Sequence, residues 1–201
     1  MEKEKLKKIW IWVVKCLKKA WIWVVKCLGW RLLLPEEGSR PEFEHCVFVT
    51  APHTSWRDFF VGAAYLWSCC SNGKILMKQE AFRWPVKRIL SQLGVIGVDR
   101  GNTKNGLVET LAKEFAENEK FSVAITPEGT RKPVKRWKRG FWEIAHGAGV
   151  PVVPTYIDFQ KKEIGAFDKV DLTNDRDADI RRIHSLYKKS MAKYPEDFIE
   201  A

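Results

Sequence analysis

Short apolar runs alternate with stretches of helical periodicity along most of the chain, and this alternation is the first guide to its fold. Runs typical of buried strands lie at residues 46–51, 74–79, 95–100, 121–126, 150–158 and 161–171. Helical patterns lie between and after them, at residues 57–70, 86–93, 105–120, 140–149 and 177–194. Short strands that alternate with helices predict an α/β fold, with a mixed, largely parallel central sheet flanked by helices.

The amino-terminal pattern is different, because it repeats a phrase of eleven residues. KKIWIWVVKCL at residues 7–17 returns as KKAWIWVVKCL at residues 18–28, with Ile9 of the first copy replaced by Ala20. Eleven residues make about three helical turns, so equivalent residues of the two copies fall on one face. The pattern predicts an amphipathic helix with a broad apolar face and a lysine stripe, which consists of Lys7, Lys8, Lys15, Lys18, Lys19 and Lys26.

We expect this helix to bind in the plane of a membrane interface, with its lysines among anionic headgroups. Spanning the bilayer would place Lys15, Lys18 and Lys19 near its centre, at a cost of about 2.5–3.5 kcal/mol each. A true span, and packing on its own domain or on a partner, are the alternatives. The residues expected to contact the membrane are Trp10, Trp12, Lys15, Lys18, Lys19, Trp21, Trp23 and Lys26.

Charge follows the same division of the chain, into an amphipathic helical segment at residues 1–34 and a globular domain at residues 35–201. The net charge is +10, of which residues 1–31 carry +7. The remaining residues carry +3, and among them RKPVKRWKR at residues 131–139 has Lys or Arg at six of nine positions. Two basic islands on a near-neutral body indicate anionic partners such as phospholipids, phosphate esters or nucleic acid.

The cysteines argue against two kinds of site. There are five, at positions 16, 27, 46, 69 and 70, and no C-x-x-C pair occurs. An odd number without that spacing suggests neither a disulfide framework nor a zinc site. We therefore expect reduced thiols in a cytoplasmic setting, and no metal.

Candidate catalytic groups follow the first strand of the globular domain, in the loop APHTSWRDFF. His53 comes directly after the strand and Asp58 five residues later, in the first turn of a helix that Thr54 or Ser55 could cap. The carboxylate would hold one ring nitrogen and raise the basicity of the other, as in the base and orienting acid of a catalytic triad. A G-x-S-x-G nucleophile motif is absent from the sequence, so the nucleophile is expected to belong to the substrate.

Two later loops also follow strands and carry groups suited to phosphate. Arg100 ends the strand at residues 95–100, and TPEGTRK follows the strand at residues 121–126. A glycine there permits close approach, a hydroxyl can donate, and a guanidinium matches phosphate with a planar fork. The candidate residues of the second loop are Glu128, Gly129, Thr130 and Arg131.

The order of these blocks resembles the glycerolipid acyltransferase family, typified by 1-acyl-glycerol-3-phosphate acyltransferases. His53 and Asp58 match the family's H-x-x-x-x-D block, and Arg100 matches the arginine of its second block. Its third block, E-G-T-R, is complete at residues 128–131, and the V-P-V-V-P at residues 150–154 matches its fourth. Thr126 and Lys132 depart from residues that the family often has beside the third block, which leaves the acceptor headgroup open.

The resemblance implies a membrane-associated acyltransferase that needs no cofactor. It would move a fatty acyl group from acyl-CoA or acyl carrier protein to the hydroxyl of a lysophospholipid, with 1-acyl-glycerol-3-phosphate giving phosphatidate as the leading case. His53 and Asp58 would be catalytic, and Arg100 and Arg131 would bind the acceptor phosphate, with Glu128 and Gly129 shaping the pocket. The expected location is the cytoplasmic face of the cell membrane, peripheral or monotopic.

Three alternatives stay open on the sequence alone. One is O-acyl transfer to another lysolipid, such as one that contains an amino acid. Another is a non-enzymatic basic protein that binds membranes. Nucleic acid is not an expected partner, because no nucleic-acid-binding motif is recognisable. The third is hydrolysis of a thioester by the same His–Asp pair, without an acceptor.

Overall fold

A computed structural model describes residues 2–36, 43–79, 86–98 and 106–201 of the chain. Within them, seven strands form one sheet in the order β1-β7-β6-β2-β5-β3-β4. Neighbouring strands pair in parallel from β6 through β2, β5 and β3 to β4. Strand β7 lies antiparallel to β6, and β1 is parallel to β7. The strands are β1 (Arg31–Leu32), β2 (Val47–Ala51), β3 (Gly73–Lys78), β4 (Val95–Val98), β5 (Ser122–Ile125), β6 (Val152–Asp158) and β7 (Glu163–Ala166).

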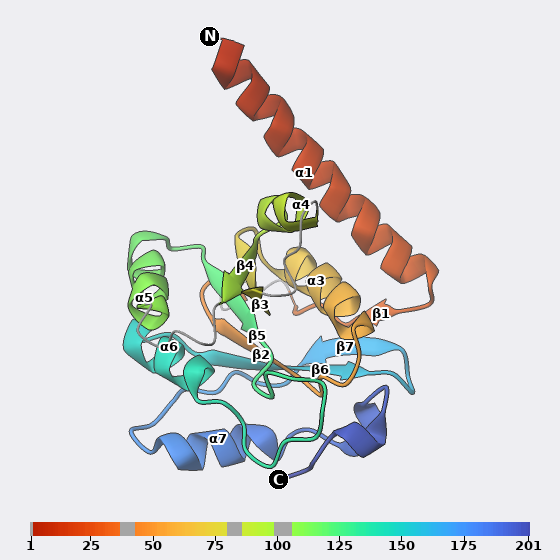
Figure 1. Cartoon of the computed structure of the whole chain (residues 1–201), viewed down its shortest axis with the longest axis vertical. Helices are drawn as coiled ribbons and strands as arrows, with labels where there is room; N and C mark the ends of the chain where they lie inside the picture. The colour runs from red at the N-terminus through yellow and green to blue at the C-terminus, as the bar shows by residue number, and fades with distance from the viewer. Residues whose placement is uncertain (1, 37–42, 80–85, 99–105) are drawn as a thin grey trace.

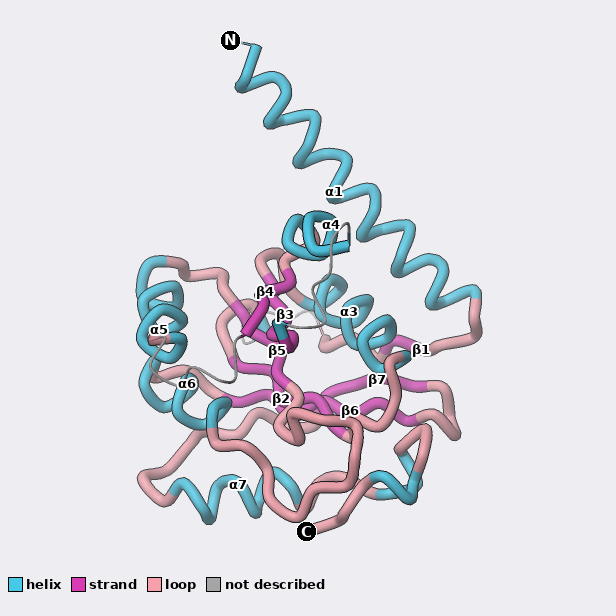
Figure 2. Tube along the Cα trace, viewed as in Figure 1, coloured by secondary structure: helices cyan, strands magenta, loops and turns pink. Residues whose placement is uncertain are grey.

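Helices cover both faces of this sheet, as the sequence predicts for a mixed, largely parallel α/β fold (Figures 1 and 2). Alternate residues of β2 explain the layers, because Val47 and Val49 face one cluster of buried side chains and Phe48 faces another. The helices are α1 (Glu2–Cys27), α3 (Arg57–Cys69), α4 (Val86–Gln92), α5 (Leu107–Glu117), α6 (Gly140–Ala148) and α7 (Arg176–His184).

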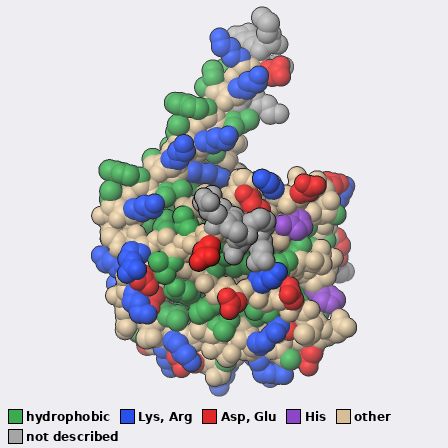
Figure 3. Space-filling model, turned by 180° about the vertical axis from the view of Figure 1, so that it is seen from behind, with side chains coloured by type: hydrophobic (Ala, Val, Ile, Leu, Met, Phe, Trp, Pro, Cys, Tyr) green, Lys and Arg blue, Asp and Glu red, His purple; other side chains and the backbone are tan. Residues whose placement is uncertain are grey.

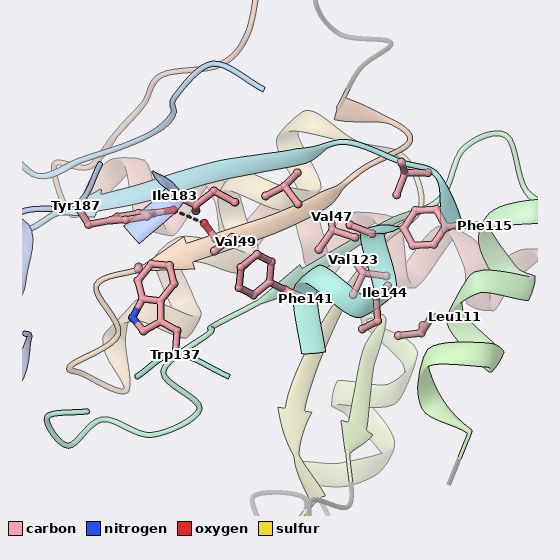
Figure 4. Close-up of a cluster of buried hydrophobic side chains, with 14 of the residues drawn as sticks. Val47, Val49, Leu111, Phe115, Val123, Trp137, Phe141, Ile144, Ile183 and Tyr187 are labelled. Carbon is pink, nitrogen blue, oxygen red and sulfur yellow. Dashed lines mark hydrogen bonds between the residues drawn. The ribbon is translucent and has the colours of Figure 1, made fainter. Parts of the chain in front are cut away.

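The larger buried cluster packs α5, α6 and α7 against the sheet (Figure 4). Phe141 and Ile144 of α6 and Phe115 of α5 meet the valines of β2, β5 and β6 there. At one end of the cluster the Tyr187 hydroxyl donates a 2.6 Å hydrogen bond to the carbonyl of Val49. This bond satisfies the polar end of a fully buried aromatic ring and holds the carboxyl-terminal segment against the sheet.

The predicted carboxyl-terminal helix at residues 177–194 is too long. The α-helix ends at His184, and two short 3₁₀ turns follow at Lys189–Met191 and Pro195–Asp197. Continuing the helix would carry Tyr187 away from the position in which it bonds Val49. The tertiary contact of this one side chain therefore overrides the helical pattern beyond residue 184.

Helix α1 confirms the predicted helical repeat and lies against the body along part of its length. Near its carboxyl end it packs on α3, where the Trp21 ring stacks on Phe60 at 4.8 Å between centroids and 15° between planes. The Trp21 indole N–H also donates a 3.0 Å bond to the Phe60 carbonyl, and Val25 is buried. The opposite end of α1 extends beyond the body, with apolar and lysine side chains along it (Figures 1 and 3).

The expected membrane-contacting residues fall into two groups in the structure. Trp21 lies on the packed side, and so does Lys18, whose ammonium lies 5.2 Å from the centroid of the Trp67 ring. Burial is the largest cause of the lowered pKa of Lys18. The exposed group consists of Trp10, Trp12, Lys15, Lys19, Trp23 and Lys26, of which Trp10 still contacts the body, since its indole N–H donates a 2.9 Å bond to the side-chain oxygen of Gln92 in α4. Among the described residues, no helix has the length and apolar character needed to cross a membrane.

Candidate active site

The predicted His–Asp pair is formed, at the carboxyl end of β2. His53 Nδ1 lies 3.0 Å from Asp58 Oδ2, and the two residues come from the loop and from the first turn of α3. The Asp58 side chain is 3% exposed and that of His53 is 21% exposed. Because an ionised carboxylate only accepts, the bond places the ring hydrogen on Nδ1 and leaves the lone pair on Nε2.

The local backbone holds Asp58 in position for this bond. The N–H of Ser55 donates to Asp58 Oδ2 at 2.8 Å, and the Ser55 hydroxyl accepts the N–H of Arg57 at 3.2 Å, where α3 begins. Thr54, the other expected capping residue, instead accepts the N–H of Tyr194 at 3.2 Å. The first turn of α3 also favours a negative charge, since the helix dipole is positive at its amino end.

Glu128 supports the same loop from behind. Its Oε1 accepts the backbone N–H of His53 at 2.9 Å, and the carboxyl group is buried. Burial, only partly offset by His53, raises the pKa of Glu128 to about 7. Glu128 Oε2 and Asp58 Oδ1 are both buried without a hydrogen-bond partner in the described part of the chain. Glu128 therefore sets the position of His53 and does not line the cavity beside it.

A cavity of about 560 Å³ opens beside His53. One wall is α3, with Phe59, Phe60 and Gly62, and the other consists of the carboxyl-terminal parts of β3 and β5. A Cβ atom built on Gly62 would meet no heavy atom within 4 Å. The cavity thus has an apolar interior with the His–Asp pair at its polar end, an arrangement suited to a long hydrocarbon that reacts at one end.

The E-G-T-R loop reaches the same cavity through three of its four residues. Gly129, Thr130 and Arg131 line it, and Gly129 has a φ of 67°, a left-handed conformation that favours glycine. Arg131 is exposed at the cavity's edge. Arg100, the arginine of the second block and the other residue expected to bind phosphate, lies outside the described residues.

The sequence interpretation did not identify the cavity walls. Trp56, Phe60 and Gly62 of the α3 region line the cavity together with Met77 and Lys78 of β3. A signal was present, because Gly62 and Ala63 fall three and four residues after Phe59, so the three residues share one side of the helix that begins beside Asp58. The contribution of β3 carries no such signal, since it depends on the strand order of the sheet.

The other histidines that the structure describes, and the cysteines, do not take part in this pair. His184 is largely buried beside Trp137, and His146 is exposed and stacks on Trp142 at 4.3 Å. Among residues 2–36, 43–79, 86–98 and 106–201, no group of three or more His, Cys, Asp and Glu side chains is arranged to hold a metal ion. None of the five cysteines, all of which lie in the described part of the chain, forms a disulfide, and Cys16 and Cys27 are exposed on α1.

Comparison with known proteins identifies the family of the chain. No curated protein matches the chain. A family model described as acyltransferase matches residues 35–158, which is more than half of the chain and includes both the His–Asp pair and the E-G-T-R loop. The chain therefore belongs to the acyltransferase family, the family of glycerolipid acyltransferases.

Proposed function

We propose that this acyltransferase moves a fatty acyl group from the thioester of acyl-CoA or acyl carrier protein to the hydroxyl of a lysophospholipid. The acceptor that fits best is 1-acyl-glycerol-3-phosphate, with phosphatidate as the product. The observation that carries this proposal is the partly buried His53–Asp58 pair at the polar end of an apolar cavity of about 560 Å³.

The chemistry follows from the free nitrogen of His53. Nε2 accepts the proton of the acceptor hydroxyl as its oxygen attacks the thioester carbonyl. Asp58 holds the ring through Nδ1 and stabilises the imidazolium that forms. Collapse of the tetrahedral intermediate forms the ester and breaks the carbon–sulfur bond, and the imidazolium returns its proton to the departing thiolate. General base catalysis of this kind contributes roughly 10²–10⁴-fold to the rate.

The substrates are assigned to the two ends of the site. The acyl chain of the donor occupies the apolar interior between α3 and β3, with its carbonyl next to His53. The phosphate of the acceptor binds at the polar rim, where Arg131 offers a guanidinium. Arg100 is assigned to the same phosphate from the family's second block.

Helix α1 is assigned to the membrane surface, on the cytoplasmic face of the cell membrane. Its Trp12 and Trp23 are each 66% exposed, and Leu17 is 48% exposed. Exposed lysines border this apolar strip, as expected for a helix that lies among anionic headgroups. Such a helix would hold the cavity at the surface where a lysolipid acceptor resides and where the product remains.

The test is a transfer assay with purified protein, anionic liposomes and labelled acyl-CoA or acyl carrier protein. Lysophosphatidate is compared with a panel of other lysolipids, including an amino-acid-containing one. We expect labelled phosphatidate to form fastest. A faster reaction on another lysolipid would reassign the headgroup, and release of labelled fatty acid without an acceptor would favour the hydrolase alternative. Absence of every labelled product would refute the proposal.

A further inference from the structure

The second basic island forms an exposed loop that the chemistry above leaves largely unused. We define the basic loop as residues 131–139, between β5 and α6. All of its cationic side chains are exposed. None of them forms an ion pair with a carboxylate in the part of the chain that the structure describes. They are Arg131, Lys132, Lys135, Arg136, Lys138 and Arg139.

The basic loop is fixed to the body despite its lack of regular structure. The N–H of Lys138 donates a 2.8 Å bond to the carbonyl of Pro127, which closes the loop at its base. Trp137 is buried, with its ring 4.2 Å from that of His184 and 5.4 Å from that of Tyr187. Val134 packs on the same core. Cations held on an anchored backbone lose little freedom when they bind an anion, which favours a specific site over a diffuse one.

The position of the basic loop suits a ligand that continues out of the cavity. Arg131 belongs both to the loop and to the cavity lining, so the loop begins at the rim. From there it runs across the lower part of the molecule in Figure 1, near the carboxyl terminus, whereas α1 leaves from the upper part. A molecule that reaches from the cavity onto the loop therefore lies away from the end of α1 that projects from the body.

We propose that the basic loop binds the phosphate groups of the CoA nucleotide when acyl-CoA is the donor. The inference rests on the proposed function, because it needs the acyl chain in the cavity and the thioester beside His53. The donor's pantetheine arm would then leave the cavity past Arg131, and its phosphates would meet the cations of the loop.

Three features favour this ligand over an acidic carrier protein or a membrane. The cations are concentrated in nine residues, which matches the compact charge of a nucleotide with several phosphates. The acidic side chains of a carrier helix would instead be spread along its axis at 1.5 Å per residue. The membrane is assigned to the opposite side, along α1.

The test compares Lys135→Ala/Arg136→Ala with a control that removes two exposed cations elsewhere, Arg181→Ala/Lys188→Ala. Binding of radiolabelled CoA is measured by equilibrium dialysis, independently of turnover. Because charge-assisted bonds to phosphate are among the stronger contacts, we expect the loop variant to raise the Kd for CoA about 10-fold or more. The control should stay within about 2-fold of the wild-type Kd.

Kinetics supply a second measurement. The loop variant should raise the KM for acyl-CoA by a similar factor and leave the rate with an acyl thioester of N-acetylcysteamine unchanged, since that donor has no phosphate. Equal CoA affinity in the wild type and both variants would overturn the inference. Weakened use of acyl carrier protein with unchanged CoA binding would overturn it in favour of protein docking.

These outcomes are separable from a failure of the proposed function. If wild type binds CoA through the loop but transfers no acyl group to any acceptor, the loop site stands and the assigned reaction fails. If wild type transfers acyl groups and the loop variant binds CoA as tightly, the reaction stands and the loop site fails. Thermal unfolding of all three proteins shows whether the substitutions leave the fold intact, which is expected because the four side chains are exposed.

Discussion

Burial of Glu128 has a measurable consequence for stability. The pKa of this carboxyl is raised from 4.5 to about 7 by desolvation. Since one pH unit corresponds to about 1.36 kcal/mol, the difference amounts to about 3 kcal/mol for this deeply buried group. The folded state holds the proton more tightly than the unfolded chain, so the free energy of unfolding falls as pH rises from about 4.5 to 7.

Substitution of Glu128 by Gln isolates this contribution. Glutamine is neutral at every pH, and its side-chain oxygen can still accept the N–H of His53, as Glu128 Oε1 does. Its amide N–H₂ would occupy the position of the unpartnered Oε2. Any cost of that change is independent of pH, so it shifts the whole stability curve without altering its shape. The nearby titrating groups, His53, Asp58 and Tyr187, are the same in both proteins.

The assay is urea or thermal unfolding of both proteins between pH 4.5 and pH 8. Between the acid and the alkaline end, the free energy of unfolding of wild type should fall by about 3 kcal/mol relative to that of Glu128→Gln. For a chain of this size that corresponds to a difference in Tm of about 6–12 °C. An exposed control, Glu117→Gln, should follow wild type. Parallel curves for wild type and Glu128→Gln would refute the reasoning.

Three further predictions follow from the site and from α1. Asp58→Asn should lower kcat about 100-fold or more with a smaller change in KM, because the His53 ring loses its anionic partner; initial rates over a range of acceptor concentrations measure both, and an unchanged kcat would contradict the role given to the pair. Gly62→Leu should shorten the acyl chain that the enzyme accepts, since its side chain enters open space in the cavity; rates across acyl-CoA chain lengths test this, and an unshifted preference would place the chain elsewhere. Trp12→Ser/Trp23→Ser should weaken binding to anionic vesicles about 10-fold or more while leaving Tm nearly unchanged, because both rings are exposed; vesicle flotation measures the binding, and equal flotation would argue against α1 as the membrane contact.

Local pattern in the sequence was sufficient for most of the sheet and for the His–Asp pair. The apolar run that becomes β2 ends at Ala51, and the short connection that follows brings His53 to 3.0 Å from Asp58 in the first turn of α3. The helical repeat likewise predicted α1, because its period matches three turns.

The rest depends on contacts between segments distant in the chain. Glu128 holds the N–H of His53 from 75 residues away, and nothing in either motif indicates a backbone bond. The antiparallel direction of β7 and the addition of Arg31–Leu32 as an edge strand are fixed by pairing in the sheet, not by periodicity. The apolar face of α1 is broad enough both to pack on the body and to contact another surface. Periodicity does not tell which residues do which, so only the structure shows that Trp21 packs on α3.

The central claim is that His53 is the general base of acyl transfer, and one comparison tests it directly. Initial rates of phosphatidate formation from labelled acyl-CoA and lysophosphatidate on anionic liposomes are measured for wild type, His53→Ala and His146→Ala. The last substitution changes an exposed histidine that does not line the cavity and serves as the matched control. We expect His53→Ala to lose about 10²–10⁴-fold of the rate while His146→Ala stays close to wild type. A folded His53→Ala protein that forms phosphatidate at the wild-type rate would contradict the account.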